Sequence, residues 1–171
     1  MALKNQGTAL QSGVDFMVSG KEGTMNKQKP SSVRTYAYGT SMSDGDVIPY
    51  GGACILDTDL GVRPVASGDV VANLMGFAVY ENRGIVEDNG YKKGGLMPNI
   101  AVCEFGEIVL PVKAGETLAI GDTVYLYYTA GSDFGKLSSS STNAIDISAK
   151  VRVSGTTQNG LVSCTLVKFA N

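Results

Sequence analysis

Short apolar runs, many of them alternating with polar residues, recur along most of the chain and are separated by glycines. In the stretch AKVRVS at 149–154 the two valines point to one face and the polar residues to the other, as in a half-buried β-strand. A sustained apolar stripe at the spacing of a helix is hard to find. The pattern therefore predicts an all-β fold, either a small β-barrel or a jelly-roll-like sandwich.

The runs predict strands at 14–18, 33–38, 53–56, 74–81, 100–112, 123–128, 149–153 and 161–169. Apolar residues occupy both faces of the last of these, so we expect it to lie inside the sheet and to form a hairpin across 155–160. The serine-rich stretch 131–148 is typical of an exposed loop.

The dipeptide Gly-Asp recurs at 45–46, 68–69 and 121–122, each time just before an apolar run. Glycine accepts a positive φ and aspartate can bond the backbone two residues further on, so each pair predicts a turn that leads into a strand. Their spacing is not constant, and a solenoid repeat is therefore not predicted.

The first 45 residues differ from the rest because they are polar and rich in glycine, with two candidate strands. So few apolar residues bury little surface by themselves. We expect residues 1–45 to form an extended N-terminal arm or a loosely attached hairpin, and residues 46–171 to form the β-domain.

Composition narrows the classes of function. The 171 residues carry a net charge of −2 without a basic stripe, which argues against a nucleic-acid partner. No apolar run reaches the roughly 18–20 residues that cross a bilayer, and the start lacks the apolar centre of a signal peptide, so we expect no membrane partner and synthesis in the cytoplasm. Only 18% of residues are charged, which favours some neutral surface for contacts with partners.

Candidate chemistry is sparse. The chain has no histidine, and its cysteines, Cys54, Cys103 and Cys164, show no CxxC spacing, so we expect reduced thiols packed as small hydrophobic side chains. The stretch GSDFGKLS at 131–138 lacks the spacing of a phosphate-binding loop. We predict no catalytic, cofactor-binding or metal-binding residue.

Carboxylate pairs are the remaining candidates for chemistry. Glu104 and Glu107 lie three apart on one predicted strand and should point to opposite faces, as solvated charges, unless a bulge at Gly106 realigns them. Asp57 and Asp59 precede a glycine without the spacing of an EF-hand, which favours a turn capped by its own aspartates.

The aromatic residues are better candidates for a functional surface. The chain has eight tyrosines, five phenylalanines and no tryptophan. Tyrosine is enriched at protein interfaces because its ring is apolar and its tip polar. Tyr125 and Tyr127 share one face of a predicted strand, and either a contact surface or partial burial at the core edge explains them.

The order GDVVANLMGFAVYENRG, IAVCEFGEIVLPVKAGETLAIGDTVYLYYTAG and AKVRVSG … LVSCTLVKFAN resembles the capsid decoration, or structural cement, proteins of tailed bacteriophages. The resemblance covers roughly residues 47–171. The matching residues are Gly76, Ala78, Gly106, Leu110, Pro111, Val112, Ala114, Gly115, Gly121, Asp122, Val124 and Tyr125.

The resemblance implies a β-barrel or sandwich that oligomerises on the outer surface of the virion and bridges neighbouring major capsid protein subunits. We expect a homo-oligomer, with a trimer favoured over a dimer. Within the arm we expect capsid contacts from Phe16, Met17, Tyr36 and Tyr38, and in the β-domain oligomer contacts from Tyr125 and Tyr127.

Two other functions compete with this one. A carbohydrate-binding or host-attachment module would present an exposed aromatic platform, and the absence of tryptophan counts against it. A hydrolase would need a functional Asp/Glu pair. We rank the cement protein first, the attachment module second and the enzyme third.

Overall fold

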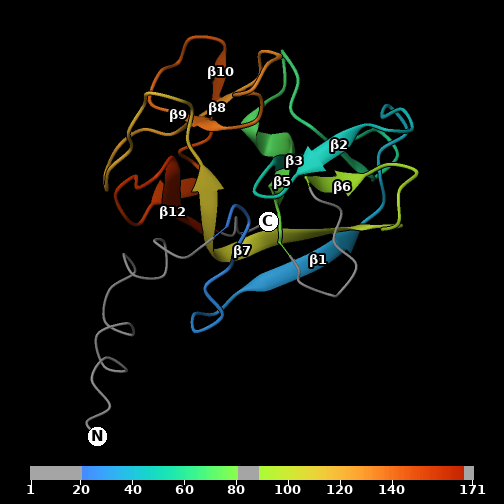
Figure 1. The fold of residues 1–171 in the computed structure, drawn as a ribbon, viewed down its shortest axis with the longest axis horizontal. Coiled ribbons are helices and arrows are strands. Elements are labelled where there is room, and N and C mark those ends of the chain that lie inside the picture. Colours follow the sequence, from blue (N-terminus) through green and yellow to red (C-terminus); the bar gives the residue numbers. More distant parts are fainter. Residues whose placement is uncertain (1–20, 81–88, 168–171) are drawn as a thin grey trace, which may run out of the picture.

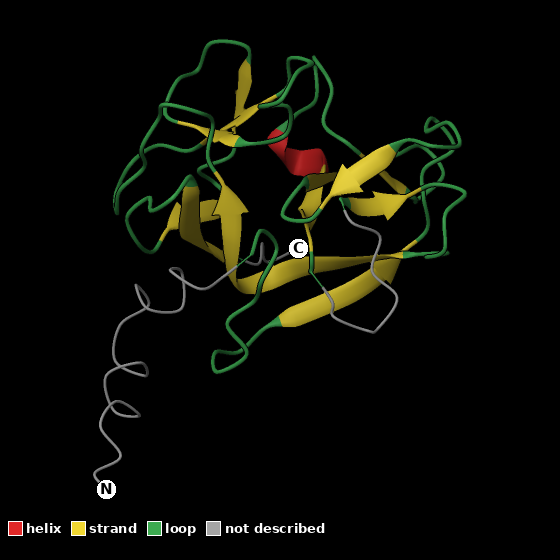
Figure 2. Cartoon of the chain, viewed as in Figure 1, coloured by secondary structure: helices red, strands yellow, loops and turns green. Residues whose placement is uncertain are grey.

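The computed structural model describes residues 21–80 and 89–167, and its fold is all-β (Figure 1). The strand predicted at 14–18 lies outside the described residues. Strands and loops make up nearly all of the described chain, with a single 3-10 turn, η1 (Val71–Asn73), among them (Figure 2).

The largest sheet has seven strands in antiparallel pairs. Its order is β11 (Val151–Val153), β12 (Leu161–Leu166), β7 (Ile100–Pro111), β5 (Leu74–Ala78), β3 (Ala53–Leu56) and β4 (Val62–Arg63), and β1 (Ser32–Tyr36) pairs with β7 as well. Two smaller sheets complete the fold, β10 (Ala144–Asp146) with β8 (Tyr125–Tyr127) and β9 (Leu137–Ser138), and β2 (Val47–Pro49) with β6 (Gly90–Lys92). The arrangement is sandwich-like, and the described strands do not close into a barrel.

Seven of the predicted strands are confirmed, with ends that differ by a few residues. The alternation at 149–154 is confirmed too, since Val151 and Val153 are buried while Arg152 is exposed. Strand β12 lies between β11 and β7, as expected of an interior strand. The exposed loop predicted at 131–148 is wrong in part, because this stretch forms β9 and β10 and buries Leu137.

The three Gly-Asp turns share one geometry. Each glycine has a positive φ between 88° and 96°. Each aspartate carboxylate accepts a hydrogen bond of 2.7 to 2.8 Å from the backbone N–H of the residue three positions earlier. The predicted turns are confirmed, although the aspartate bonds backward along the chain because the turn brings the earlier amide to it.

The 12-residue strand β7 organises the core. Strands β1 and β5 both pair with Val102 and Cys103, so they lie on opposite edges of β7. Side chains on both faces of β7 are fully buried, among them the consecutive residues Ile108, Val109 and Leu110. Burial on both faces explains why this strand is almost continuously apolar.

The chain that leads into β1 crosses β7. Gly23 lies on the β5 edge, where its N–H donates to a β7 carbonyl over 2.8 Å and its own carbonyl accepts from the N–H of Tyr80 over 2.9 Å. Residues 27–31 then pass Gly106, and β1 continues along the opposite edge (Figure 1). A Cβ atom at Gly106 would lie 2.7 Å from that of Ser31, so glycine permits the close approach.

Residues 21–45 thus contribute β1 and two core side chains, Met25 and Met42, to the described body. The predicted division of the chain at residue 45 stays a prediction.

Candidate functional site

Asp57 organises the turn between β3 and β4. Its carboxylate accepts hydrogen bonds from the hydroxyl and the N–H of Ser41, over 2.6 and 3.0 Å, and from the N–H of Thr58 over 2.9 Å. The bonds from Ser41 hold the pKa of Asp57 below its usual range. Asp59 accepts from the N–H of Gly61 over 3.2 Å, so the predicted turn capped by its own aspartates is confirmed.

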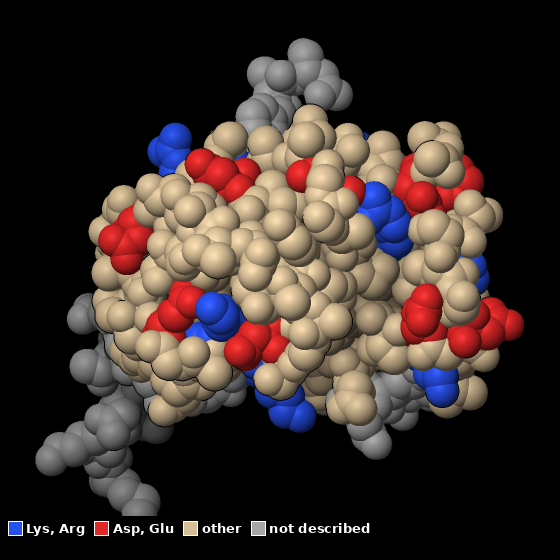
Figure 3. Space-filling view, turned by 90° about the horizontal axis from the view of Figure 1, so that it is seen from above, with Lys and Arg blue, Asp and Glu red and all other residues tan. Residues whose placement is uncertain are grey.

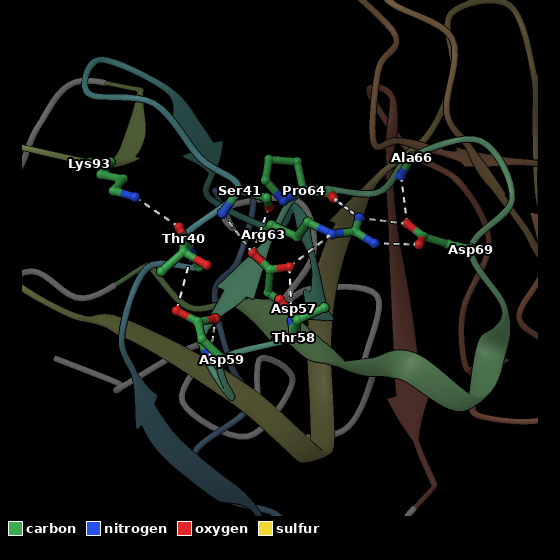
Figure 4. Close-up of polar contacts among 12 residues, drawn as sticks. Thr40, Ser41, Asp57, Thr58, Asp59, Arg63, Pro64, Ala66, Asp69 and Lys93 are labelled. Atoms are coloured by element: carbon green, nitrogen blue, oxygen red, sulfur yellow. Dashed lines mark hydrogen bonds and ion pairs between the residues drawn. The ribbon is translucent and has the colours of Figure 1, made fainter.

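Arg63 joins this turn to the segment before β5. Its guanidinium makes two hydrogen bonds to Asp69, of 2.8 and 2.6 Å, and one of 2.9 Å to the carbonyl of Pro64, and its Nε lies 3.8 Å from Asp57 (Figure 4). Burial alone would raise the pKa of Asp69, but the bonds from Arg63 and from the N–H of Ala66 outweigh it and lower that pKa. A planar guanidinium that bonds a carboxylate twice fixes direction as well as distance.

Two leucines project from loops that are bonded to the same segment, residues 39–42. Leu60 is 76% exposed in the β3–β4 turn, and Leu96 is 74% exposed between β6 and β7. The Lys93 ammonium donates to two carbonyls of this segment over 2.9 and 2.7 Å. The carboxylates of the β3–β4 turn accept from amides of the same segment (Figure 4). Polar groups therefore hold both apolar side chains at one end of the molecule.

The predicted contact residue Tyr38 lies close to one of these loops, since its hydroxyl donates to the carbonyl of Met97 over 3.0 Å. Tyr36 lies on β1 and donates to the carboxylate of Glu104. Burial, and then this bond, raise the pKa of Tyr36 to about 12. Both tyrosines are half-buried. Phe16 and Met17 lie outside the described residues.

The predicted oligomer contacts, Tyr125 and Tyr127, are half-buried on β8 while Leu126 between them is fully buried. Lys113 Nζ lies 4.8 Å from the centroid of the Tyr127 ring. The structure thus places both tyrosines on the outer face of their sheet, and their role in contacts between copies stays a prediction.

Glu107 is 3% exposed, so the prediction of a solvated charge at this position is wrong. Its carboxylate accepts hydrogen bonds from Asn26 Nδ2 over 2.7 Å and from the hydroxyls of Ser154 and Ser163, both over 3.0 Å. Burial alone would raise the pKa of Glu107, but bonds from Lys29 and these three residues outweigh it and lower that pKa. The Glu107 carboxylate therefore links β7 to the segment around Asn26 and to the β11–β12 hairpin.

A cavity of about 310 Å³ opens beside Tyr50 and Tyr80 and is also lined by Lys21, Glu22 and Leu161. The two rings meet edge to face, with centroids 5.0 Å apart, and Lys21 Nζ lies 5.2 Å from the centroid of the Tyr80 ring. Tyr50 is only 6% exposed. Tyr50 therefore offers no open ring face on which a sugar could stack.

The three thiols of the chain are buried. Cys54, Cys103 and Cys164 are buried free thiols, as expected, and burial raises the pKa of each one. Within residues 21–80 and 89–167, no group of three or more His, Cys, Asp and Glu side chains could hold a metal ion. The same part of the chain contains no helix long and apolar enough to cross a membrane.

The fold and these contacts define an all-β protein in which polar side chains brace turns and strands. A family model described as structural cement protein (E217 gp24/Pam3 gp6) matches residues 10–167. The chain therefore belongs to the phage structural cement protein family, and it has a structural, capsid-associated role in the virion.

Solved structures agree on the fold. A chain from a structure titled "The capsid of Myoviridae Phage XM1" is 18% identical, with a TM-score of 0.73. The match covers 88% of this chain and 91% of that one. Comparison with curated protein sequences finds no match.

The sequence prediction missed Leu60 and Leu96, because an isolated leucine in a polar loop carries no periodic signal. It also missed the buried role of Glu107. The available signal in the sequence was that Glu107 interrupts a long apolar run. In the structure the residues on both sides of it, Gly106 and Ile108, are buried.

Proposed function

We propose that this chain binds the outer surface of a phage capsid and stabilises it by bridging neighbouring major capsid protein subunits, without catalysing a reaction. The observation that supports this most strongly is the family match over residues 10–167, which spans nearly the whole chain. A small β-domain with modest affinity suits this task, because many copies bound along a lattice stabilise the shell together.

The test compares shells of the major capsid protein with and without the purified chain. Bound chain should raise the temperature at which the shells open, and cryo-electron microscopy should place it on the outside between subunits. Shells that bind the chain at full occupancy but open at an unchanged temperature would contradict stabilisation. Density on the inner surface would contradict the proposed location.

The chain is further proposed to act as a homo-oligomer, with a trimer favoured over a dimer and contacts from Tyr125 and Tyr127. Both tyrosines are half-buried on one face of β8, which leaves part of each ring for a neighbour. Mass measurement of the purified chain, together with a Tyr125→Ser/Tyr127→Ser variant, tests this. A monomeric wild-type protein would refute it.

Residues 1–45 are proposed to wrap adjacent capsid subunits, with contacts from Phe16, Met17, Tyr36 and Tyr38. Because residues 21–45 also supply β1 and core side chains, the test removes only residues 1–20. Reduced occupancy on shells would support the proposal for this part of the arm, and unchanged occupancy would contradict it.

A further inference from the structure

We infer that one end of the molecule, formed by Leu60 and Leu96 with the surrounding carboxylates of Asp44, Asp46 and Asp59, is the surface that docks on the capsid shell. We call it the leucine end. This inference rests on the proposed function and adds the place of contact and the chemistry of the partner.

Leu60 and Leu96 are the two most exposed of six large apolar side chains exposed in the described chain. Their loops contact the same segment, since Gly61 packs against Gly39 and Lys93 bonds its carbonyl. An exposed leucine gains free energy when a partner removes it from water, and apolar side chains in a polar rim are the usual core of a docking site. The leucine end has this composition.

The backbone at Leu60 supports the same inference. Its φ is +66°, a conformation that leucine rarely adopts and that glycine or asparagine accepts more readily. The turn keeps this conformation through the Leu60 N–H bond to the Asp57 carbonyl, 3.2 Å, and the Asp57 N–H bond to the Gly61 carbonyl, 2.8 Å. Strain of this kind at an exposed apolar residue points to a use for the side chain outside the monomer.

The charge around the leucines indicates the partner. Asp44, Asp46 and Asp59 are exposed, and the exposed cation Lys92 lies beside them because it pairs with Val47 across β2 and β6. Figure 3 shows carboxylates at the right-hand end of the molecule as well as elsewhere on this face, with Lys or Arg side chains among them. In a two-fold contact between copies of this chain, the same carboxylates would face one another and repel. We infer that the partner is a surface on the shell with an apolar hollow edged by Lys or Arg, because such a surface is complementary to both the leucines and the carboxylates.

The test measures binding of the full chain to shells of the major capsid protein by co-sedimentation. The variant Leu60→Asn/Leu96→Asn removes both apolar side chains, and asparagine suits the positive φ at position 60. Ile120→Asn is the matched control, because Ile120 is 71% exposed on the loop that leads into β8. We expect at least a tenfold weaker affinity for the double variant, an unchanged affinity for the control, and weaker wild-type binding as salt rises.

The other outcomes separate the inference from the proposed function. Wild-type protein that fails to bind shells would overturn the proposed function and the inference together. Binding by the double variant equal to that of the wild type would overturn the inference alone. Loss of an oligomer by the double variant in the absence of shells would also overturn the inference, since the leucines would then join copies of the chain. Circular dichroism confirms that both variants are folded.

Discussion

The Nζ atom of Lys29 lies 2.8 Å from the carboxylate of Glu107, which connects the segment that crosses β7 to a buried charge on β7 itself. Lys29 follows Asn26, which donates to the same carboxylate, and precedes β1. The Glu107 carboxylate therefore bonds the crossing on one side and, through Ser154 and Ser163, the β11–β12 hairpin on the other. One buried acid holds three parts of the sheet in place.

Glu107→Gln should lower the free energy of unfolding by about 1–3 kcal/mol, because the variant loses charge-assisted hydrogen bonds inside the protein. Lys29→Ala should cost about 0–1 kcal/mol, since the Lys29 side chain is 55% exposed and its ion pair competes with water. Urea unfolding at pH 7 measures both. An equal loss of unfolding free energy in the two variants would contradict the larger role of the buried Glu107 carboxylate.

Gly76→Ala should destabilise the protein strongly, by about 3 kcal/mol or more. A Cβ atom there would lie 2.0 Å from the Cys103 carbonyl oxygen on β7, and backbone cannot move aside cheaply. Gly115→Ala is the matched control, with φ of +79° and nothing within 4 Å of the added atom. Its cost should be about 1 kcal/mol, from backbone strain alone. Thermal unfolding distinguishes the two, and similar losses would contradict the steric argument.

The sequence predicted the long, regular elements well and the short ones poorly. Strand β7 buries residues on both faces, so its sequence is a long apolar run. Such a run can be recognised from the sequence alone. Strands such as β4 and β9 have two residues each, too few for any periodicity. The Gly-Asp turns were predictable because glycine and aspartate act locally, whereas the pairing of β1 with β7 depends on residues far apart in the chain, such as Val33 and Cys103.

The sequence predicted Tyr38 as a contact residue, and its hydroxyl bonds the carbonyl of Met97, next to Leu96, while its role in contacts stays a prediction. The role of Glu107 depends on Asn26, 81 residues away, and on the β11–β12 hairpin. No local pattern encodes contacts at such separations. The conformation of Leu60 was equally hidden, because its positive φ follows from the bonds of the folded turn.

We expect the contribution of Glu116 to the free energy of unfolding to depend on pH. Burial alone would raise its pKa, but bonds from Lys113, Ser139 and Ser138 lower it from 4.5 to about 2. A carboxyl with a lowered pKa in the folded state stabilises above its unfolded pKa, and that contribution is lost as the pH falls from 4.5 towards 2. Glu116→Gln should therefore cost about 1–2 kcal/mol at pH 7, and the difference from the wild type should shrink in this range.

Thermal unfolding from pH 7 down to pH 2.5 measures this difference. Asp122→Asn is a useful control, because Asp122 is exposed and its carboxylate accepts a hydrogen bond from the Ala119 N–H of its own turn. A difference between wild type and Glu116→Gln that stays constant across the range would contradict the lowered pKa.

The Arg63 guanidinium bonds both oxygens of Asp69 and the carbonyl of Pro64 at the same time. Arg63→Lys keeps the positive charge but cannot bond both oxygens of Asp69 and the Pro64 carbonyl together, so we expect a loss of about 1–3 kcal/mol in unfolding free energy. Arg152→Lys on the exposed face of β11 should stay within about 0.5 kcal/mol of the wild type. Because Arg63 also lies near Asp57, Arg63→Lys should loosen the turn that presents Leu60, and hydrogen exchange at the Gly61 amide should quicken in that variant only.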